Sequence, residues 1–295
     1  MSAETTIEWT EKTWNPVRGC SIVSPGCVNC YAMKQAHRFS GEGRAYHGLT
    51  KLTKAGPQWT GQVRCVDEAL TEPLRWRKPV RVFVNSMSDL FHEDVPDVFI
   101  ERVFSVMALA ERHTFQVLTK RPQRMREWFR ARRFDVKGYA ILQTENADEC
   151  RYAHPWPLPN VWLGVSVENQ PCADERIPWL LETPAMIRFV SYEPALDYVN
   201  FRRWRNALDW IIFGLESGAH ARSGDADWGR DLIAACVGAR AKPFIKQLGA
   251  QGFDSARTAS GRSESLNLRD KKGGDPAEWS ADLRVREFPT QRCIT

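Results

Sequence analysis

The sequence contains no apolar run long enough to cross a bilayer. Asp, Glu, Lys or Arg interrupts every apolar stretch, whereas a membrane-spanning helix needs about 20 consecutive, mostly apolar residues. The first residues, MSAETTIEWTEKTWNP, are polar and acidic and lack the apolar segment of a secretory signal peptide. We therefore expect a cytoplasmic protein that has no membrane partner.

The net charge of the chain is also small. The chain has 41 Lys and Arg against 36 Asp and Glu, a formal net charge of +5. Such a charge permits contact with polyanions but does not indicate it. Basic side chains concentrate in three segments, which we interpret either as solvated helix faces or as a surface for nucleic acid or nucleotide phosphates: 120–126, 130–133 and 202–205.

Cysteine is not abundant, but its distribution is uneven. Of the eight cysteines, Cys20, Cys27 and Cys30 lie within one short loop, and the last two have C-x-x-C spacing. Disulfides are rare in the cytoplasm, so clustered cysteines indicate metal binding or catalysis. Three thiolates suit an iron–sulfur cluster with one iron left for another ligand. They also suit a zinc site completed from elsewhere, for which the candidate fourth ligands are His37, His47 and Cys65.

Apolar strands alternate with amphipathic helices along most of the chain, and we find no internal repeats beyond these units. This alternation predicts an α/β protein with a full or partial (β/α) barrel of parallel strands. We expect a strand at 6–10, a helix at 31–39 and a long excursion at 40–62 that could cover a site. The expected strands are 80–86, 114–120, 160–168, 186–192, 210–215 and 243–248, and the expected helices are 96–110, 123–132, 173–181 and 227–239.

The last part of the chain has a different composition. Residues 251–272 are polar and rich in Gly, Ser and Arg, without periodicity, and some pattern returns at 279–289. We therefore predict a barrel domain over 1–249 and a loop-rich C-terminal extension, 250–295, that packs on the barrel.

Polar side chains follow nearly every predicted strand. One such side chain could simply cap a helix, but six successive strand ends are harder to explain in this way. In barrels of this class the ligand site lies at the C-terminal ends of the strands, so we predict a convergent site there. Its candidate residues are Asn85, Ser86, Ser88, Asp89, Thr119, Lys120, Ser166, Glu168, Asn169, Ser191, Tyr192, Glu193, Glu216, Ser217, Gly218, Lys246 and Gln247.

Seven motifs follow one another along the chain: Thr13-Trp-Asn-Pro-Val-Arg-Gly-Cys20, Ser24-Pro-Gly-Cys-Val-Asn-Cys-Tyr-Ala32, Phe83-Val-Asn-Ser-Met-Ser-Asp-Leu-Phe91, Leu118-Thr-Lys-Arg-Pro122, Ser191-Tyr-Glu-Pro194, Phe213-Gly-Leu-Glu-Ser-Gly218 and Phe244-Ile-Lys-Gln-Leu-Gly249. In combination they resemble the motifs of a phage and prophage protein family that is regarded as radical-SAM-like and has no settled activity. The resemblance covers about residues 9–249. It implies a TIM-barrel-like fold with a [4Fe–4S] cluster and S-adenosylmethionine (SAM) at its mouth.

The resemblance implies that the protein is a radical SAM enzyme that cleaves SAM reductively. On this interpretation Cys20, Cys27 and Cys30 bind the cluster, and a reductant such as a flavodoxin or ferredoxin supplies the electron. The substrate stays unknown, and a nucleotide or nucleic acid is possible. We predict that Ser86, Asp89, Ser166, Glu168, Asn169 and Ser217 bind SAM, and that Lys120, Glu193, Glu216 and Lys246 serve substrate binding or proton transfer.

The cysteine spacing departs from the usual radical-SAM loop, C-x-x-x-C-x-x-C. Six residues separate Cys20 from Cys27, and the aromatic Tyr31 follows Cys30 instead of preceding it. Two alternatives therefore stay open. One is a zinc-binding protein that binds nucleic acid through its basic segments and exposed tryptophans. The other is a barrel hydrolase or lyase that uses Glu193 and Glu216, with structural cysteines.

Overall fold

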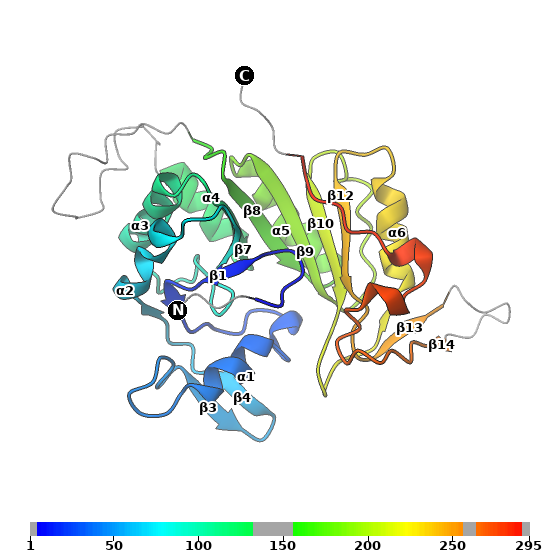
Figure 1. The fold of residues 1–295 in the computed structure, drawn as a ribbon, viewed down its shortest axis with the longest axis horizontal. Helices are drawn as coiled ribbons and strands as arrows, with labels where there is room; N and C mark the ends of the chain where they lie inside the picture. Colours follow the sequence, from blue (N-terminus) through cyan, green and yellow to red (C-terminus); the bar gives the residue numbers. More distant parts are fainter. Residues whose placement is uncertain (1–4, 132–155, 256–263, 291–295) are drawn as a thin grey trace. The chain divides into compact units, whose positions relative to one another are not determined.

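The computed structural model describes residues 5–131, 156–255 and 264–290. The chain forms two compact units. The N-terminal unit runs up to Gly164 and includes Glu182–Met186, and the C-terminal unit is built from Val165–Leu181 and Ile187–Cys293. Figure 1 shows both units as ribbons. The predicted division at residue 249 stays a prediction.

The main sheet has seven strands in the order β1-β6-β7-β8-β9-β10-β12. The order is open, with β1 at one end and β12 at the other, and the pairings given for β1–β6, β6–β7, β9–β10 and β10–β12 are parallel. The predicted α/β fold with a partial barrel of parallel strands is confirmed. The strands are β1 (Lys12–Trp14), β6 (Arg81–Val84), β7 (Thr114–Thr119), β8 (Val161–Val167), β9 (Ile187–Ala195), β10 (Trp210–Leu215) and β12 (Lys242–Gln247).

The N-terminal unit packs α3 (Asp97–Leu109) and α4 (Pro122–Ala131) together through aromatic side chains. Phe104 of α3 stacks on Trp128 of α4 with ring centroids 5.0 Å apart, and both side chains are buried. A short helix, α2 (Asp67–Leu70), accepts a hydrogen bond at Ala69 O from the buried Trp14 indole of β1, at 2.8 Å. Burial of such large apolar side chains dominates the stability of this unit.

A smaller lobe of the N-terminal unit, which we call the flap, comprises residues 31–65. It contains α1 (Tyr31–Arg38), the antiparallel hairpin of β3 (Thr50–Thr53) and β4 (Gly56–Trp59), and β5 (Arg64–Cys65). Strand β2 (Val17–Arg18) pairs antiparallel with β5, so the chain enters and leaves this region at one place. The flap has its own apolar cluster: Ala32, Met33, Ala36, Tyr46, Leu49 and Trp59.

The C-terminal unit contains the end of β8 from Val165, strands β9, β10 and β12, α5 (Gln170–Glu182) up to Leu181, and α6 (Asp227–Cys236). It also contains a small sheet of β11 (Gly224–Asp225), β13 (Gly252–Asp254) and β14 (Glu264–Ser265). All six residues of β10 are buried. The final described segment lies along β12, because Ile245 N donates to Val285 O and Glu287 N donates to Pro243 O.

The strand predicted at 6–10 is wrong, because the described part of that segment is turn and extended chain, and the strand is β1 at Lys12–Trp14. Trp9 is buried and contacts Phe83 with ring centroids 4.7 Å apart, so it anchors the turn and does not belong to a ladder. None of the helices in the described residues is long and apolar enough to span a membrane.

Candidate functional site

The three-cysteine loop lies at the C-terminal ends of β1 and β6, as expected from the sequence. It leaves β1, and Gly19 forms a parallel bridge with Ser88, which follows β6. The Ser88 hydroxyl donates to Val17 O at 2.7 Å. The backbone of Gly19 has φ +88°, and a Cβ there would lie 2.2 Å from Gln62 O, so glycine is required for this close approach.

The three thiols are free and lie within electrostatic reach of one another. Cys27 ends a 3-10 turn, Pro25–Cys27, and Cys30 is the N-cap of α1. Burial raises the pKa of the Cys20 thiol to about 12; nearby Asp89 raises this pKa further, and Arg121 opposes the rise. Burial also raises the pKa of Cys30, while its electrostatic interaction with Lys120 lowers it. Cys20 and Cys30 both pack against the apolar cluster of the flap.

The donor set of the loop consists of three free thiols. Within the described ranges, no three His, Cys, Asp or Glu side chains gather closely enough to hold one ion. A closed zinc site needs four such ligands around one point. In a four-iron cluster each cysteine binds a different iron, so its three thiolates stand farther apart. Three thiols that share one loop could supply the three ligands that such a cluster takes from the protein, which leaves one iron open.

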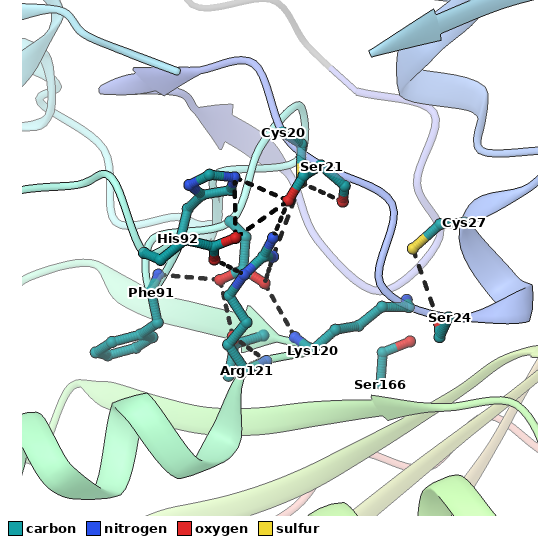
Figure 2. A network of polar contacts seen from close by, with 12 residues as sticks. Cys20, Ser21, Ser24, Cys27, Phe91, His92, Lys120, Arg121 and Ser166 are labelled. Atoms are coloured by element: carbon teal, nitrogen blue, oxygen red, sulfur yellow. Dashed lines mark hydrogen bonds and ion pairs between the residues drawn. The ribbon is translucent and has the colours of Figure 1, made fainter. Parts of the chain in front are cut away.

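A buried ion pair connects the cysteine loop to the end of β7 (Figure 2). The Arg121 side chain donates to Asp89 Oδ2 at 3.1 Å, to Ser21 Oγ at 2.6 Å and to Glu93 Oε2 at 2.7 Å. Arg121 Nη1 also lies 4.0 Å from Cys20 Sγ. The Ser21 hydroxyl is shared with the buried His92 imidazole at 2.9 Å, and burial and Arg121 lower the pKa of His92, which favours its neutral form.

Asp89 organises the backbone at the same place. Its carboxylate accepts from Phe91 N at 2.9 Å, Thr119 Oγ1 at 2.8 Å and Lys120 N at 3.0 Å. The predicted residues Asp89 and Lys120 are therefore brought to the cysteine loop. Ser86 also lies here, because its carbonyl accepts from the Tyr31 hydroxyl at 2.8 Å and its side chain donates to Asn15.

In the C-terminal unit, four further predicted residues come together. Lys246 Nζ lies 2.7 Å from Glu193 Oε1, and Ser191 Oγ donates to Glu193 Oε2 at 3.0 Å. Ser166 Oγ donates to the carbonyl of Glu193 at 3.0 Å. Gly214 makes room for this carboxylate, since a Cβ at 214 would lie 2.6 Å from Glu193 Oε1.

Two other predicted glutamates are held by arginines that the sequence reasoning missed. Fully buried Glu168 pairs with Arg176 at 3.0 Å, and Glu216 pairs with Arg222 through two nitrogens, at 2.5 and 2.9 Å. Spacing could have suggested both, because each arginine follows its glutamate within the next turn or helix. Asn169 accepts from Cys172 N at the start of α5, which is a helix-capping contact, and Ser217 is half-buried after β10.

The basic segment after β7 is used within the protein. Arg124 pairs with Asp97 at 3.3 Å and donates to Val95 O, and Arg126 pairs with Glu182 at 2.6 Å. Together with Arg121, these arginines have carboxylate partners, which disfavours the segment as a phosphate surface. Residues 132 and 133 of the second basic segment lie outside the described residues.

Comparison with known proteins gives a family and a weak structural likeness. The family model described as "Protein of unknown function (DUF5131)" matches residues 4–274. A spore photoproduct lyase complexed with dinucleoside spore photoproduct is similar with a TM-score of 0.41 and 10% identity, over 81% of this chain and 64% of that chain. A mutant of that lyase with bound AdoMet and dinucleoside spore photoproduct has a TM-score of 0.43 and 10% identity, over 92% and 72%. This chain thus spans less than two thirds of the first lyase chain. No curated protein matches.

Proposed function

We propose that this chain, which belongs to the DUF5131 family, is a radical SAM enzyme whose [4Fe–4S] cluster would be held by Cys20, Cys27 and Cys30. The observation that carries the proposal is three free thiols in one loop at the C-terminal ends of β1 and β6. When bound, such a cluster would supply the one-electron chemistry for reductive cleavage of SAM.

The residues around the loop would act on the protonation of its thiols in opposite directions. The thiols must lose their protons to become ligands, and burial opposes this by raising the pKa of Cys20 and Cys30. The positive charges of Arg121 and Lys120 act in the opposite direction at these two thiols. Arg121 also holds the loop in position through Ser21, so the protein supplies both charge and orientation to its ligands.

The remaining predicted residues complete the proposal. We assign SAM binding to Ser86, Asp89, Ser166, Glu168, Asn169 and Ser217, and substrate contact or proton transfer to Lys120, Glu193, Glu216 and Lys246. The ion pair between Glu193 and Lys246 would allow a proton to pass between a carboxylate and an ammonium group. The reductant would be a flavodoxin or ferredoxin, and the substrate a nucleotide or nucleic acid.

The test is anaerobic reconstitution with iron and sulfide, followed by metal analysis and incubation with SAM and dithionite. The wild-type protein should bind iron and yield 5′-deoxyadenosine. Cys20→Ala, Cys27→Ala and Cys30→Ala should each lose iron, because alanine offers no ligand. Cys65→Ala is the matched control and should keep iron, since Cys65 lies in β5, outside the loop. Preference for zinc after anaerobic purification, or loss of metal in the Cys65 variant, would contradict the proposal.

A further inference from the structure

The excess of positive over negative charge in the sequence comes from the flap. Residues 31–65 contain six Lys and Arg and a single carboxylate, Glu42, so the excess of this one lobe equals the net charge of +5 of the whole chain. All six basic side chains are exposed: Lys34, Arg38, Arg44, Lys51, Lys54 and Arg64. Outside the flap, the numbers of basic and acidic residues are therefore equal, whereas the flap itself has a net positive charge.

The flap differs from the basic segment after β7 in how its charges are used. Arg121, Arg124 and Arg126 all have carboxylate partners. In the part of the chain that the structure describes, none of the six flap side chains makes an ion pair, and Arg64 donates only to the backbone carbonyl of His47, at 3.0 Å. Positive charge that is exposed and not neutralised within the protein attracts an external polyanion.

Exposed aromatic and apolar side chains lie among these charges. Tyr31 is the first residue of α1 and Phe39 is its C-cap; they are 50% and 48% exposed, and Leu52 of β3 is 71% exposed. The hydroxyl of Tyr31 is fixed on Ser86 O, so its half-exposed ring is held in one orientation. Basic side chains interleaved with exposed rings are typical of surfaces that bind single-stranded nucleic acid, where phosphates meet the cations and bases stack on the rings.

The flap is firmly connected to the cysteine loop. Its apolar cluster packs directly against Cys20 and Cys30, and the His37 imidazole of α1 bonds to Thr50 Oγ1 of β3 at 3.1 Å. A strand bound on the flap would thus lie next to the cysteines. An acidic protein would use the charges but would not need the exposed rings, so a nucleic acid fits the surface better.

We propose that the flap, residues 31–65, is a binding surface for single-stranded nucleic acid. The further claim that the bound strand is the substrate rests on the proposed function, whereas the binding itself does not. The surface takes phosphodiester groups on Lys34, Arg38, Lys51 and Lys54 and unstacked bases on Phe39 and Tyr31.

The test measures binding of fluorescein-labelled DNA and RNA oligonucleotides of about 20 nucleotides by fluorescence anisotropy, at several salt concentrations. The variant is Lys51→Ala/Lys54→Ala. Its matched control is Lys271→Ala/Lys272→Ala, which removes two exposed lysines outside the flap. For single strands, each phosphate contact contributes about 0.7 to the slope of log K against log salt. The flap variant should therefore lose about 1.4 of slope and bind about 25-fold more weakly at 0.1 M salt, while the control binds like wild type.

The variant Phe39→Ala tests how much base stacking contributes to binding, because it removes an aromatic ring and leaves the net charge unchanged. It should weaken binding at least about fivefold without changing the salt slope. Circular dichroism melts of all variants establish that each is folded.

Four outcomes would overturn the proposal: no binding by wild type, binding that is independent of salt, equal losses in the flap variant and the control, or binding of phosphatidylserine vesicles without binding of oligonucleotides. Failure of the proposed function would appear separately, as a chain that binds oligonucleotides through the flap but takes up no iron on reconstitution.

Discussion

Removing Arg121 should be among the most destabilising single changes in the N-terminal unit. Arg121 and Asp89 form a pair whose side chains are 9% and 7% exposed, with nitrogen and oxygen 3.1 Å apart. In Arg121→Ala the Asp89 carboxylate would keep its backbone donors but lose its cation while it stays buried. A buried charge that loses its partner is costly, because water cannot replace the cation.

The magnitude can be worked from the three contacts of the guanidinium. Breaking a buried pair costs about 3–5 kcal/mol, and the remaining donors to Asp89 place this case near the lower value. The bond to Ser21 Oγ adds about 1 kcal/mol. The bond to Glu93 adds about 0–1 kcal/mol, because Glu93 is 60% exposed. The expected loss is thus about 4 kcal/mol of a total that is typically about 5–15 kcal/mol.

The measurement is urea unfolding followed by both tryptophan fluorescence and circular dichroism, and coincidence of the two transitions justifies a two-state fit. The matched control is Arg124→Ala, because the partner of Arg124, Asp97, is 56% exposed, and its loss should be about 1 kcal/mol. The double variant Arg121→Ala/Asp89→Asn should be less destabilised than the sum of its single changes, since no charge is left unpaired. Equal losses in Arg121→Ala and Arg124→Ala would refute this reasoning.

Three further predictions concern other parts of the chain. Gly214→Ala should lower the free energy of unfolding by about 1–3 kcal/mol, measured by urea titration, because the new Cβ would meet Glu193 at 2.6 Å; unchanged stability would show that the ion pair moves freely. Gly19→Ala should cost at least about 2 kcal/mol, measured as a shift in thermal midpoint, because φ is +88° and Gln62 O stands 2.2 Å from the new Cβ; a neutral result would contradict the close approach. Burial raises the pKa of the Cys236 thiol from 9.0 to about 11, so the unfolded state loses this proton first. Stability should then be retained below pH 9 and fall as the pH rises through 11, and Cys236→Ala should show a smaller fall over that range.

Strand positions followed from the sequence where a run of buried side chains has clear polar boundaries. The strand predicted at 210–215 coincides with β10, whose residues are all buried. Strand β1 could not be found in this way, because it has three residues and only Trp14 is buried. The hairpin of β3 and β4 was also missed. Its residues are mostly exposed or half-buried, and its pairing depends on packing of Trp59 into the flap cluster, which is a tertiary effect.

The candidate site could likewise be predicted from the sequence only in part. Spacing identified the cysteines, and strand ends identified Asp89 and Lys120, because the C-terminal ends of parallel strands lie together. Arg121 was assigned with its segment either to a solvated helix face or to a phosphate surface, because an arginine after a strand most often lies on a helix surface. Which carboxylate an arginine meets depends on how the loops pack. The pairing of Arg121 with Asp89, 32 positions apart, is therefore visible only in three dimensions.

The antiparallel pairing of β2 with β5 has a consequence for how the protein could evolve. Val17 pairs with Cys65 and Arg18 with Arg64, so the ends of the intervening segment are already held side by side. Lengthening a segment whose ends are fixed costs little conformational entropy, because the closure cost grows only with the logarithm of length. Residues 40–61, which follow the three cysteines, could therefore change in length and composition between relatives while β1 and β6 keep their register. The family could in this way acquire new binding specificities by exchanging one lobe and leaving the sheet intact.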